Sequence, residues 1–462
     1  MSGAVRLLYR FNPDVQSIKR SGNRITLEVK DWRPVGFTAA ATSHADAIMA
    51  LADGATLSQL DEIAAASGDA EPASKAMRYY IDRFAYARML TWSLLDDKGE
   101  LASVQALAKR YKPKLGVAPD DDLVLCRFAF VRQLGGQATM ESGLVRARVG
   151  WRPRGLDRLA GILAHPHQAV PGSLAEALWR LGFLDTTEPE RNGAHRCWEF
   201  HDLLMHETSR ANRDITPVGG TYRFDGMFPP LPAIKPAVAG RRIELGKVDP
   251  ARIRQQSKSI DSLQAARCSI RDYAEAAVSL SSLSEFLWRV CRTTAHIRDE
   301  RQDVIVRPYP AGGSINELEF YVAAHRCDGL EPAVYHYDSH GHALVQLDAS
   351  ARAAQKIIEG AVKALVLKSG QLPPALTIVV TTRLPRLAWK YQGMAYRATL
   401  MNVGVVYHLM YMVATDMGLG PCAIGTADSR LLEDVAGLAR LEETAIAEFA
   451  LGIPAVAGNT AQ

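Results

Sequence analysis

Two arginines and a serine at alternate positions form the first set of residues that could bind a ligand. Arg267, Ser269 and Arg271 stand two residues apart, so in an extended segment their side chains point to the same side of the backbone. Two guanidinium groups and a hydroxyl offer a phosphate group both hydrogen-bond donors and positive charge. A solvated basic stretch explains the same residues, and for this segment taken alone it is the simpler explanation.

Paired glycines mark a second place where the backbone could approach a ligand. Gly312 and Gly313 follow Pro310 and Ala311. Without side chains they let the chain come close to a flat ring, and their N–H groups can meet its heteroatoms. A plain surface turn accounts for them equally well. The same two explanations apply to three later glycines, Gly418, Gly420 and Gly425.

Lys390 and Tyr391 are the candidates for proton transfer. A lysine partly buried beside a cofactor can lose its proton and act as a base, and a neighbouring tyrosine can relay that proton. On the local sequence alone, a solvated lysine and a packing tyrosine are the better explanation. His201 and His206 lie five residues apart, which suits neither one helix face nor a zinc site, so we predict no metal. No G-x-G-x-x-G sequence follows a strand, which argues against a Rossmann-type site.

The elements that must position these residues are helices and strands of an α+β domain. Residues 375–381 form an apolar, β-branched stretch that predicts a buried strand shortly before Lys390. A long helix is predicted from Tyr396 to the glycine at position 418. Ser282 and Glu285 have the spacing of a capping box, which predicts the start of another helix.

The N-terminal half contains two groups of strands and helices in a similar order. In the first group, alternating apolar residues at 25–29 predict a strand, and helices are expected at 43–52, 58–66 and 76–88. Strands and then helices recur between residues 123 and 181. We interpret these as two winged-helix-like modules. The predicted parts of the chain are residues 1–115 and 116–225 (modules), 226–260 (a proline-rich linker) and 261–462 (the α+β domain).

Composition is that of a soluble globular protein. The 462 residues are 48% hydrophobic and 23% charged, with a formal net charge of +4. This small charge gives no ground for a nucleic-acid partner. The N-terminus has no secretory signal, and the most apolar stretch, residues 395–419, contains Arg397, Asn402, His408 and Asp416. We therefore expect a buried core helix rather than a membrane span, and a cytoplasmic protein.

Taken together and in this order, several segments resemble the SagB-type dehydrogenases, the thiazole- and oxazole-forming azoline oxidases of the nitroreductase superfamily. The resemblance runs from about Trp198 to Ile453. Its segments are Trp198–Asp202, Ser209–Arg210, Pro217–Tyr222, the Arg267, Ser269 and Arg271 set, Arg307–Gly313, Lys390–Tyr391 and Gly418–Gly420.

The resemblance implies an α+β, nitroreductase-like FMN domain and a homodimer with two FMN molecules at the subunit interface. It implies that Arg267, Ser269 and Arg271 bind the FMN phosphate and that Lys390 and Tyr391 take part in catalysis. It also implies N-terminal modules that recognise a ribosomal precursor peptide, and a cyclodehydratase as a possible partner. It further implies that glycine-rich backbone flanks the isoalloxazine. The further predicted cofactor-binding residues are Pro310, Gly312, Gly313, Gly420 and Gly425.

The chain departs from the family pattern at two places. Ala311 stands where the family usually has a serine, so no hydroxyl is available there for the flavin. No basic residue follows Gly452, although nitroreductase-like chains often place one on the phosphate.

Three functions remain open from the sequence. In the first, Lys390 takes the α-proton of a thiazoline or oxazoline, FMN takes the hydride, and oxygen reoxidises the flavin. In the second, the flavin oxidises or oxygenates another peptide side chain, or reduces quinones and nitroarenes with NAD(P)H. In the third, the protein is a peptide-binding scaffold without a cofactor.

Overall fold

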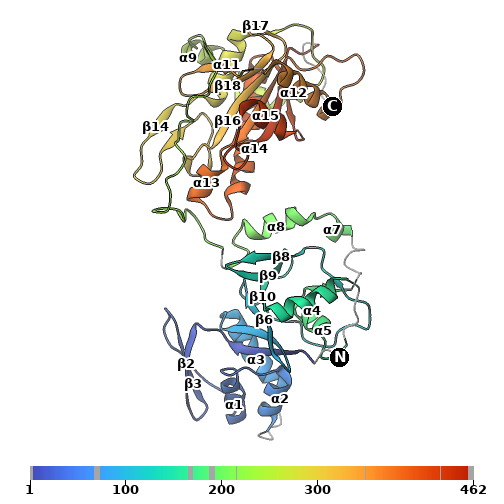
Figure 1. Cartoon of the computed structure of the whole chain (residues 1–462). Helices are drawn as coiled ribbons and strands as arrows, with labels where there is room; N and C mark the ends of the chain where they lie inside the picture. The colour runs from blue at the N-terminus through green and yellow to red at the C-terminus, as the bar shows by residue number, and fades with distance from the viewer. Residues whose placement is uncertain are drawn as a thin grey trace. The chain divides into compact units, whose positions relative to one another are not determined.

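The computed structural model describes residues 4–66, 73–164, 170–186, 193–214, 216–348, 350–426 and 428–455. The chain divides into two compact units, Met1–Val218 and Gly219–Gln462 (Figure 1).

A six-stranded antiparallel sheet forms the centre of the N-terminal unit. In sheet order its strands are β1 (Arg6–Phe11), β5 (Leu90–Asp96), β6 (Gly99–Ala106), β10 (Ala147–Trp151), β9 (Gln137–Ser142) and β8 (Ala129–Leu134). Smaller sheets are formed by β2 (Val15–Ser21), β3 (Arg24–Val29) and β4 (Val35–Thr38), and by β7 (Val124–Leu125) and β11 (Leu184–Asp185). The helices are α1 (Thr42–Ala50), α2 (Leu57–Ala65), α3 (Ala73–Tyr86), α4 (Pro153–Ala164), α5 (Leu174–Leu181), α7 (Gly193–Arg196) and α8 (Phe200–Thr208).

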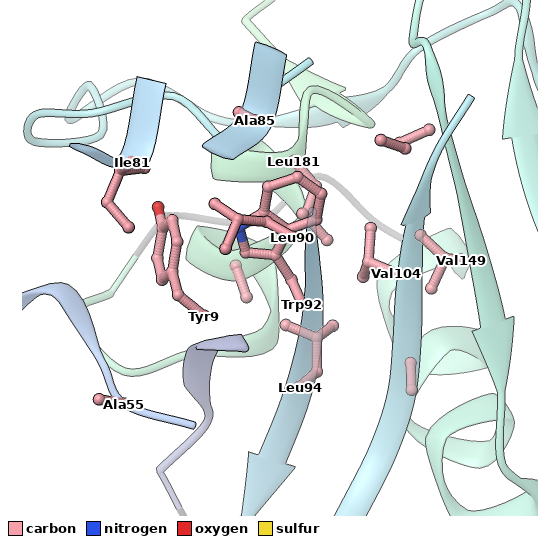
Figure 2. Close-up of a cluster of buried hydrophobic side chains, with 14 of the residues drawn as sticks. Tyr9, Ala55, Ile81, Ala85, Leu90, Trp92, Leu94, Val104, Val149 and Leu181 are labelled. Carbon is pink, nitrogen blue, oxygen red and sulfur yellow. The ribbon is translucent and has the colours of Figure 1, made fainter. Parts of the chain in front are cut away.

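One hydrophobic core holds this unit together. Trp92 is fully buried at its centre, with its ring at a steep angle to that of Tyr9 and a centroid distance of 6.1 Å. Figure 2 shows side chains from β1, α3 and β5 gathered with Val149 and Leu181. The boundary predicted at residue 115 therefore does not separate two cores, because β6 pairs with β10 across it. The winged-helix character of the two parts stays a prediction.

A seven-stranded antiparallel sheet forms the C-terminal unit. In sheet order its strands are β12 (Arg241–Glu244), β19 (Ala343–Gln346), β18 (Ala333–Asp338), β16 (Leu318–Ala324), β20 (Leu376–Thr382), β22 (Thr444–Gly452) and β21 (Gly420–Ile424). Short pairs are formed by β13 (Val278–Ser279) with β17 (Cys327–Asp328) and by β14 (Ala295–Ile297) with β15 (Val304–Val306). The helices are α9 (Pro250–Gln256), α10 (Ile260–Ala266), α11 (Leu280–Cys291), α12 (Ala351–Ala364), α13 (Leu384–Lys390), α14 (Ala395–Asp416) and α15 (Ser429–Ala436), with a 3₁₀ turn at Gly312–Ser314.

Helices cover both faces of this sheet, which explains why its central strands are apolar throughout. Every residue of β16 is buried. Its Phe320 and Val322 pack with residues of α11 and α14, whereas Tyr321 and Ala323 pack with residues of α12 and α15. The α+β fold expected for this part of the chain is confirmed.

The residues predicted as a linker, 226–260, lie within the C-terminal unit. Their strand β12 pairs with β19 and forms one edge of the seven-stranded sheet. Residues 228–232 form a strap that receives hydrogen bonds from α13, because Trp389 Nε1 donates to Phe228 O and Arg386 donates to Leu231 O. Proline-rich composition here reflects an extended, bound segment.

The first turn of α11 differs from the prediction. The helix begins at Leu280, and its N-cap is Ser279, whose Oγ accepts the N–H of Ser282. The predicted cap at Ser282 is wrong by one turn because this earlier serine already satisfies the free backbone donor. Glu285, expected to complete the capping box, instead forms ion pairs with Arg252 and Arg289.

The long helix α14 is a core element. By length and composition it could cross a membrane, but half of its apolar stretch is buried inside the unit. Val406, Met410 and Val413 pack into the same core as Phe320. Gly418, which follows the helix, adopts the left-handed conformation with φ of +70°, as its glycine predicts.

Candidate functional site

The Arg267, Ser269 and Arg271 segment follows α10 and runs along the edge strand β21. The Ile270 N–H donates to Pro421 O over 2.8 Å, which fixes the segment to the strand. A Cβ at Gly420 would lie 3.0 Å from Ile270 Cγ2, so the missing side chain permits this close approach. Gly420 therefore supports the segment by packing against it.

The donor set of this segment fits a phosphate group. Arg267 and Arg271 are exposed, and neither forms an ion pair within the part of the chain that the structure describes. Ser269 lies between them in sequence, with its Oγ 2.8 Å from the Tyr411 hydroxyl. The Arg267 guanidinium lies over the Tyr411 ring, 5.4 Å from its centroid. Two uncompensated cations beside a hydroxyl suit a dianion.

The glycine loop holds a turn that requires glycine. Gly313 has φ of +60° within the 3₁₀ turn. The Gly312 N–H donates to Asn402 Oδ1 over 3.1 Å, and Asn402 Nδ2 donates to the Glu317 carboxylate over 3.0 Å. Asn402 of α14 thus accepts the Gly312 N–H, and the expectation that this N–H meets a ligand ring stays a prediction.

Lys390 and Tyr391 converge on this glycine loop. Lys390 ends α13, and its Nζ donates to Gly313 O over 3.4 Å. A Cβ at Gly313 would lie 2.8 Å from Lys390 Nζ and would collide with the Tyr391 hydroxyl. The structure thus brings together three of the predicted residues, whereas Pro310 is exposed at the start of the loop.

The segment after Gly219 covers Lys390 from another side. The Thr221 N–H donates to Lys390 O over 2.8 Å, and Gly220 forms a bridge with Tyr391. Lys390 Nζ also lies over the Tyr222 ring, 5.8 Å from its centroid. The proposed catalytic amine therefore sits among a carbonyl and two aromatic rings.

Arg386 fixes α13 to its surroundings. This fully buried side chain donates to Leu231 O over 2.5 Å, to Asp303 O over 2.9 Å and to Ile315 O over 3.1 Å. Burial lowers its pKa to about 10. Since Ile315 directly follows the glycine turn, Arg386 joins the strap, the glycine loop and the helix that carries Lys390.

A buried carboxylate, Glu319 of β16, has two arginine side chains and one histidine side chain as neighbours. Burial opposes the charge of Glu319, but His336, Arg307 and Arg383 lower its pKa to about 2. Its oxygens lie 3.6 Å from Arg383 and 3.8 Å from Arg307. Glu319 therefore stays ionised and compensates the buried guanidinium groups.

The two clusters lie on opposite sides of α14. Asn402 contacts the glycine loop, and Tyr411 contacts the phosphate-binding set. Nine residues of an α-helix are two and a half turns, about 13.5 Å along the axis and about 180° around it. Gly425 belongs to neither cluster: it is exposed beyond β21, and a Cβ there would meet open space.

Sequence reasoning missed Tyr411 and Asn402. Both stand in a helix whose apolar pattern predicts only packing. A buried asparagine in such a helix is the one signal that could have been used, since it requires hydrogen-bond partners. Tyr411 gave no signal of its own.

Comparisons with known proteins match two parts of the chain. Residues 265–453 match the nitroreductase family, and residues 123–214 match the cyanobactin oxidase ThcOx family. A nitroreductase-type protein of Methanocaldococcus jannaschii is 26% identical over 159 residues, which are 34% of this chain and 74% of that protein.

Solved structures of low identity also align with the chain. A nitroreductase-type protein from Ralstonia eutropha is 19% identical, with 49% of this chain and 95% of that chain covered and a TM-score of 0.36. The Escherichia coli microcin synthetase McbBCD complex with truncated pro-MccB17 bound is 18% identical, with 50% and 90% covered and a TM-score of 0.34.

Nitroreductase-family proteins are flavin-binding oxidoreductases, and the second matched segment is that of an oxidase. The chain therefore carries a nitroreductase-family oxidoreductase domain together with a cyanobactin-oxidase segment, which confirms its resemblance to the SagB-type, nitroreductase-like azoline oxidases.

Proposed function

We propose that this chain is an FMN-dependent dehydrogenase that oxidises thiazoline or oxazoline rings of a ribosomally made peptide to aromatic azoles. The observation that carries the proposal is the convergence of Lys390 and Tyr391 on the Gly313 turn. The match of residues 123–214 to cyanobactin oxidases supports a peptide substrate.

The phosphate of FMN would be held by Arg267, Ser269 and Arg271, and the glycine loop would lie beside its ring system. When bound, FMN supplies the acceptor for a hydride. The proton transfer is assigned to side chains of this chain.

Lys390 is the proposed base. In its unprotonated form its Nζ would accept the α-proton of the azoline ring, and the adjacent ring carbon would give up the hydride for which FMN, when bound, is the acceptor. A double bond then forms between these two carbons, so the ring becomes aromatic. The hydrogen bond from Nζ to Gly313 O holds the amine at the loop, and the Tyr391 hydroxyl would relay the proton.

A homodimer completes the proposed site. Because the phosphate-binding set and the Lys390 cluster lie on opposite sides of α14, we take each flavin to draw on two copies of the chain. The helix also exposes an apolar stripe on its solvent side, Tyr396, Leu400, Met401 and Val405, which are 47%, 39%, 59% and 39% exposed. Pairing of two copies through this stripe would bury it and join the clusters of different copies.

The experiment is an anaerobic visible spectrum of the purified protein, before and after an azoline-containing peptide is added. We expect a flavin band that bleaches on mixing. Lys390→Ala should retain the band but bleach at least about a hundredfold more slowly, since general-base catalysis contributes roughly 10²–10⁴. Lys363→Ala, which changes an exposed lysine of α12, is the matched control and should behave as the wild type.

Other results would favour the other functions. A Lys390→Ala protein that bleaches at the wild-type rate would refute the assignment of the base. Rapid bleaching by NADPH alone, with no response to azolines, would favour a nitro or quinone reductase. If the purified protein binds no flavin, the third function, a peptide-binding scaffold without a cofactor, is the one that remains.

A further inference from the structure

We propose that Tyr411 is a positioning residue that directs the Ser269 hydroxyl toward the FMN phosphate and so makes the site select FMN over riboflavin. This inference rests on the proposed function, because it assumes that the Arg267, Ser269 and Arg271 set binds the phosphate.

The Tyr411 hydroxyl is fixed by the edge of the sheet. It accepts the N–H of Ala423 over 2.9 Å. Ala423 lies on β21, whose opposite edge pairs with β22 in the register Ala423 to Phe449. The tyrosine thus satisfies an outward backbone donor that the sheet leaves unpaired.

Either hydroxyl can donate in the bond between Tyr411 and Ser269, and a bound phosphate would decide between the two directions. A tyrosine hydroxyl has one proton, and the Ser269 Oγ lies 2.8 Å away. When Tyr411 donates this proton to Ser269, the serine proton is left for a third group. A phosphate oxyanion is a stronger acceptor than a phenol, so a bound phosphate selects this arrangement.

The Cys422 thiol does not compete with the phosphate for the Ser269 proton. The Cys422 thiol lies close to both hydroxyls, and burial raises its pKa, so it stays a neutral thiol and a weak acceptor. The phosphate is then the strongest acceptor available to Ser269.

The ring of Tyr411 supports a second member of the set. It lies under the Arg267 guanidinium and is itself held by Phe449, whose ring stands at 79° with a centroid distance of 5.2 Å. A phenylalanine at this position would keep both ring contacts, so the hydroxyl can be tested separately.

Tyr407 provides a matched control one turn earlier on α14. Its hydroxyl also accepts a strand N–H, that of Glu448 over 3.0 Å, and it donates to the backbone of the same sheet. It makes no contact with Ser269 among the described hydrogen bonds. Tyr407→Phe therefore removes a comparable tyrosine-to-strand bond without touching the phosphate-binding set.

The test is a titration of flavin-free protein with FMN and, separately, with riboflavin, followed by flavin fluorescence. Tyr411→Phe should weaken FMN binding by about tenfold, as expected for a hydrogen bond to a charged group, and riboflavin binding by less than about twofold. Tyr407→Phe should change neither the affinity for FMN nor the affinity for riboflavin. In a Ser269→Ala background, Tyr411→Phe should add less than about twofold, because the two residues act through one hydroxyl.

Two results would overturn the inference alone. One is a Tyr411→Phe protein that binds FMN as tightly as the wild type while Ser269→Ala does not. The other is an equal loss of FMN and riboflavin binding, which indicates a general structural role. If the wild-type protein binds no FMN, the proposed function fails and this inference fails with it.

Discussion

Glu448 is a buried carboxyl group that should make stability depend on pH. It lies on β22, 5% exposed, and burial, with a smaller contribution from Asp428, raises its pKa from 4.5 to about 7. Between these two values the folded chain holds a proton that the unfolded chain releases. Stability therefore falls as pH rises through this window.

We predict that Glu448→Gln removes this dependence. Relative to the wild type, the variant should gain stability between pH 5 and pH 8, up to about 3 kcal/mol from a shift of this size. Thermal unfolding midpoints of both proteins across this range are the measurement. Curves that stay parallel would show that Glu448 is ionised in the folded protein.

At the level of single residues, the sequence named candidate residues by their types but not the side chains that they contact. The convergence of Lys390, Tyr391 and Gly313 links residues nearly eighty positions apart. Their types were recognisable, but their proximity depends on how α13 folds back onto the glycine loop. The same reason hid Tyr411, since nothing in its own neighbourhood marks it as a partner of Ser269.

Helix α13 is the element on which the placement of Lys390 depends. Arg386 donates from this helix to three carbonyl groups in three different segments. Burial makes those carbonyls costly to leave unpaired.

We therefore predict that Arg386→Met destabilises the C-terminal unit by about 3 kcal/mol or more. Arg352→Met, at an exposed position on α12, is the control and should change stability by less than about 0.5 kcal/mol. The measurement is the free energy of unfolding of both variants and the wild type in denaturant. A loss confined to activity, with unchanged stability, would mean that Arg386 does not hold the unit together.

Elements with strong apolar patterns were predictable, and elements defined by distant pairing were not. The buried stretch at 375–381 and the long helix from Tyr396 were both found close to their observed bounds. Strand β12 was missed inside a proline-rich segment, because its place in the sheet is set by pairing with β19, about a hundred residues away. The one-core N-terminal unit was missed for the same reason, since β6 pairs with β10.

At the scale of the whole molecule, the exposed apolar stripe of α14 is the surface through which we propose that two copies of the chain pair. We predict that Met401→Glu converts the proposed dimer into a monomer and lowers FMN affinity at least about tenfold, because a buried charge at an interface is costly. Light scattering and flavin titration measure the two effects.

The control is Leu441→Glu, which adds the same charge at a leucine that is 90% exposed elsewhere on this unit. It should leave both mass and affinity unchanged. A Met401→Glu protein that remains dimeric and keeps its flavin would place the interface on another surface.

The placement of the two clusters on opposite sides of α14 has a genetic consequence. If each site draws on both copies, an allele defective in Arg267 and an allele defective in Lys390 can rescue each other. A hybrid of the two combines both defects in one site and leaves the other site intact. Two inactive alleles expressed together would thus yield an active protein, whereas either allele alone would not.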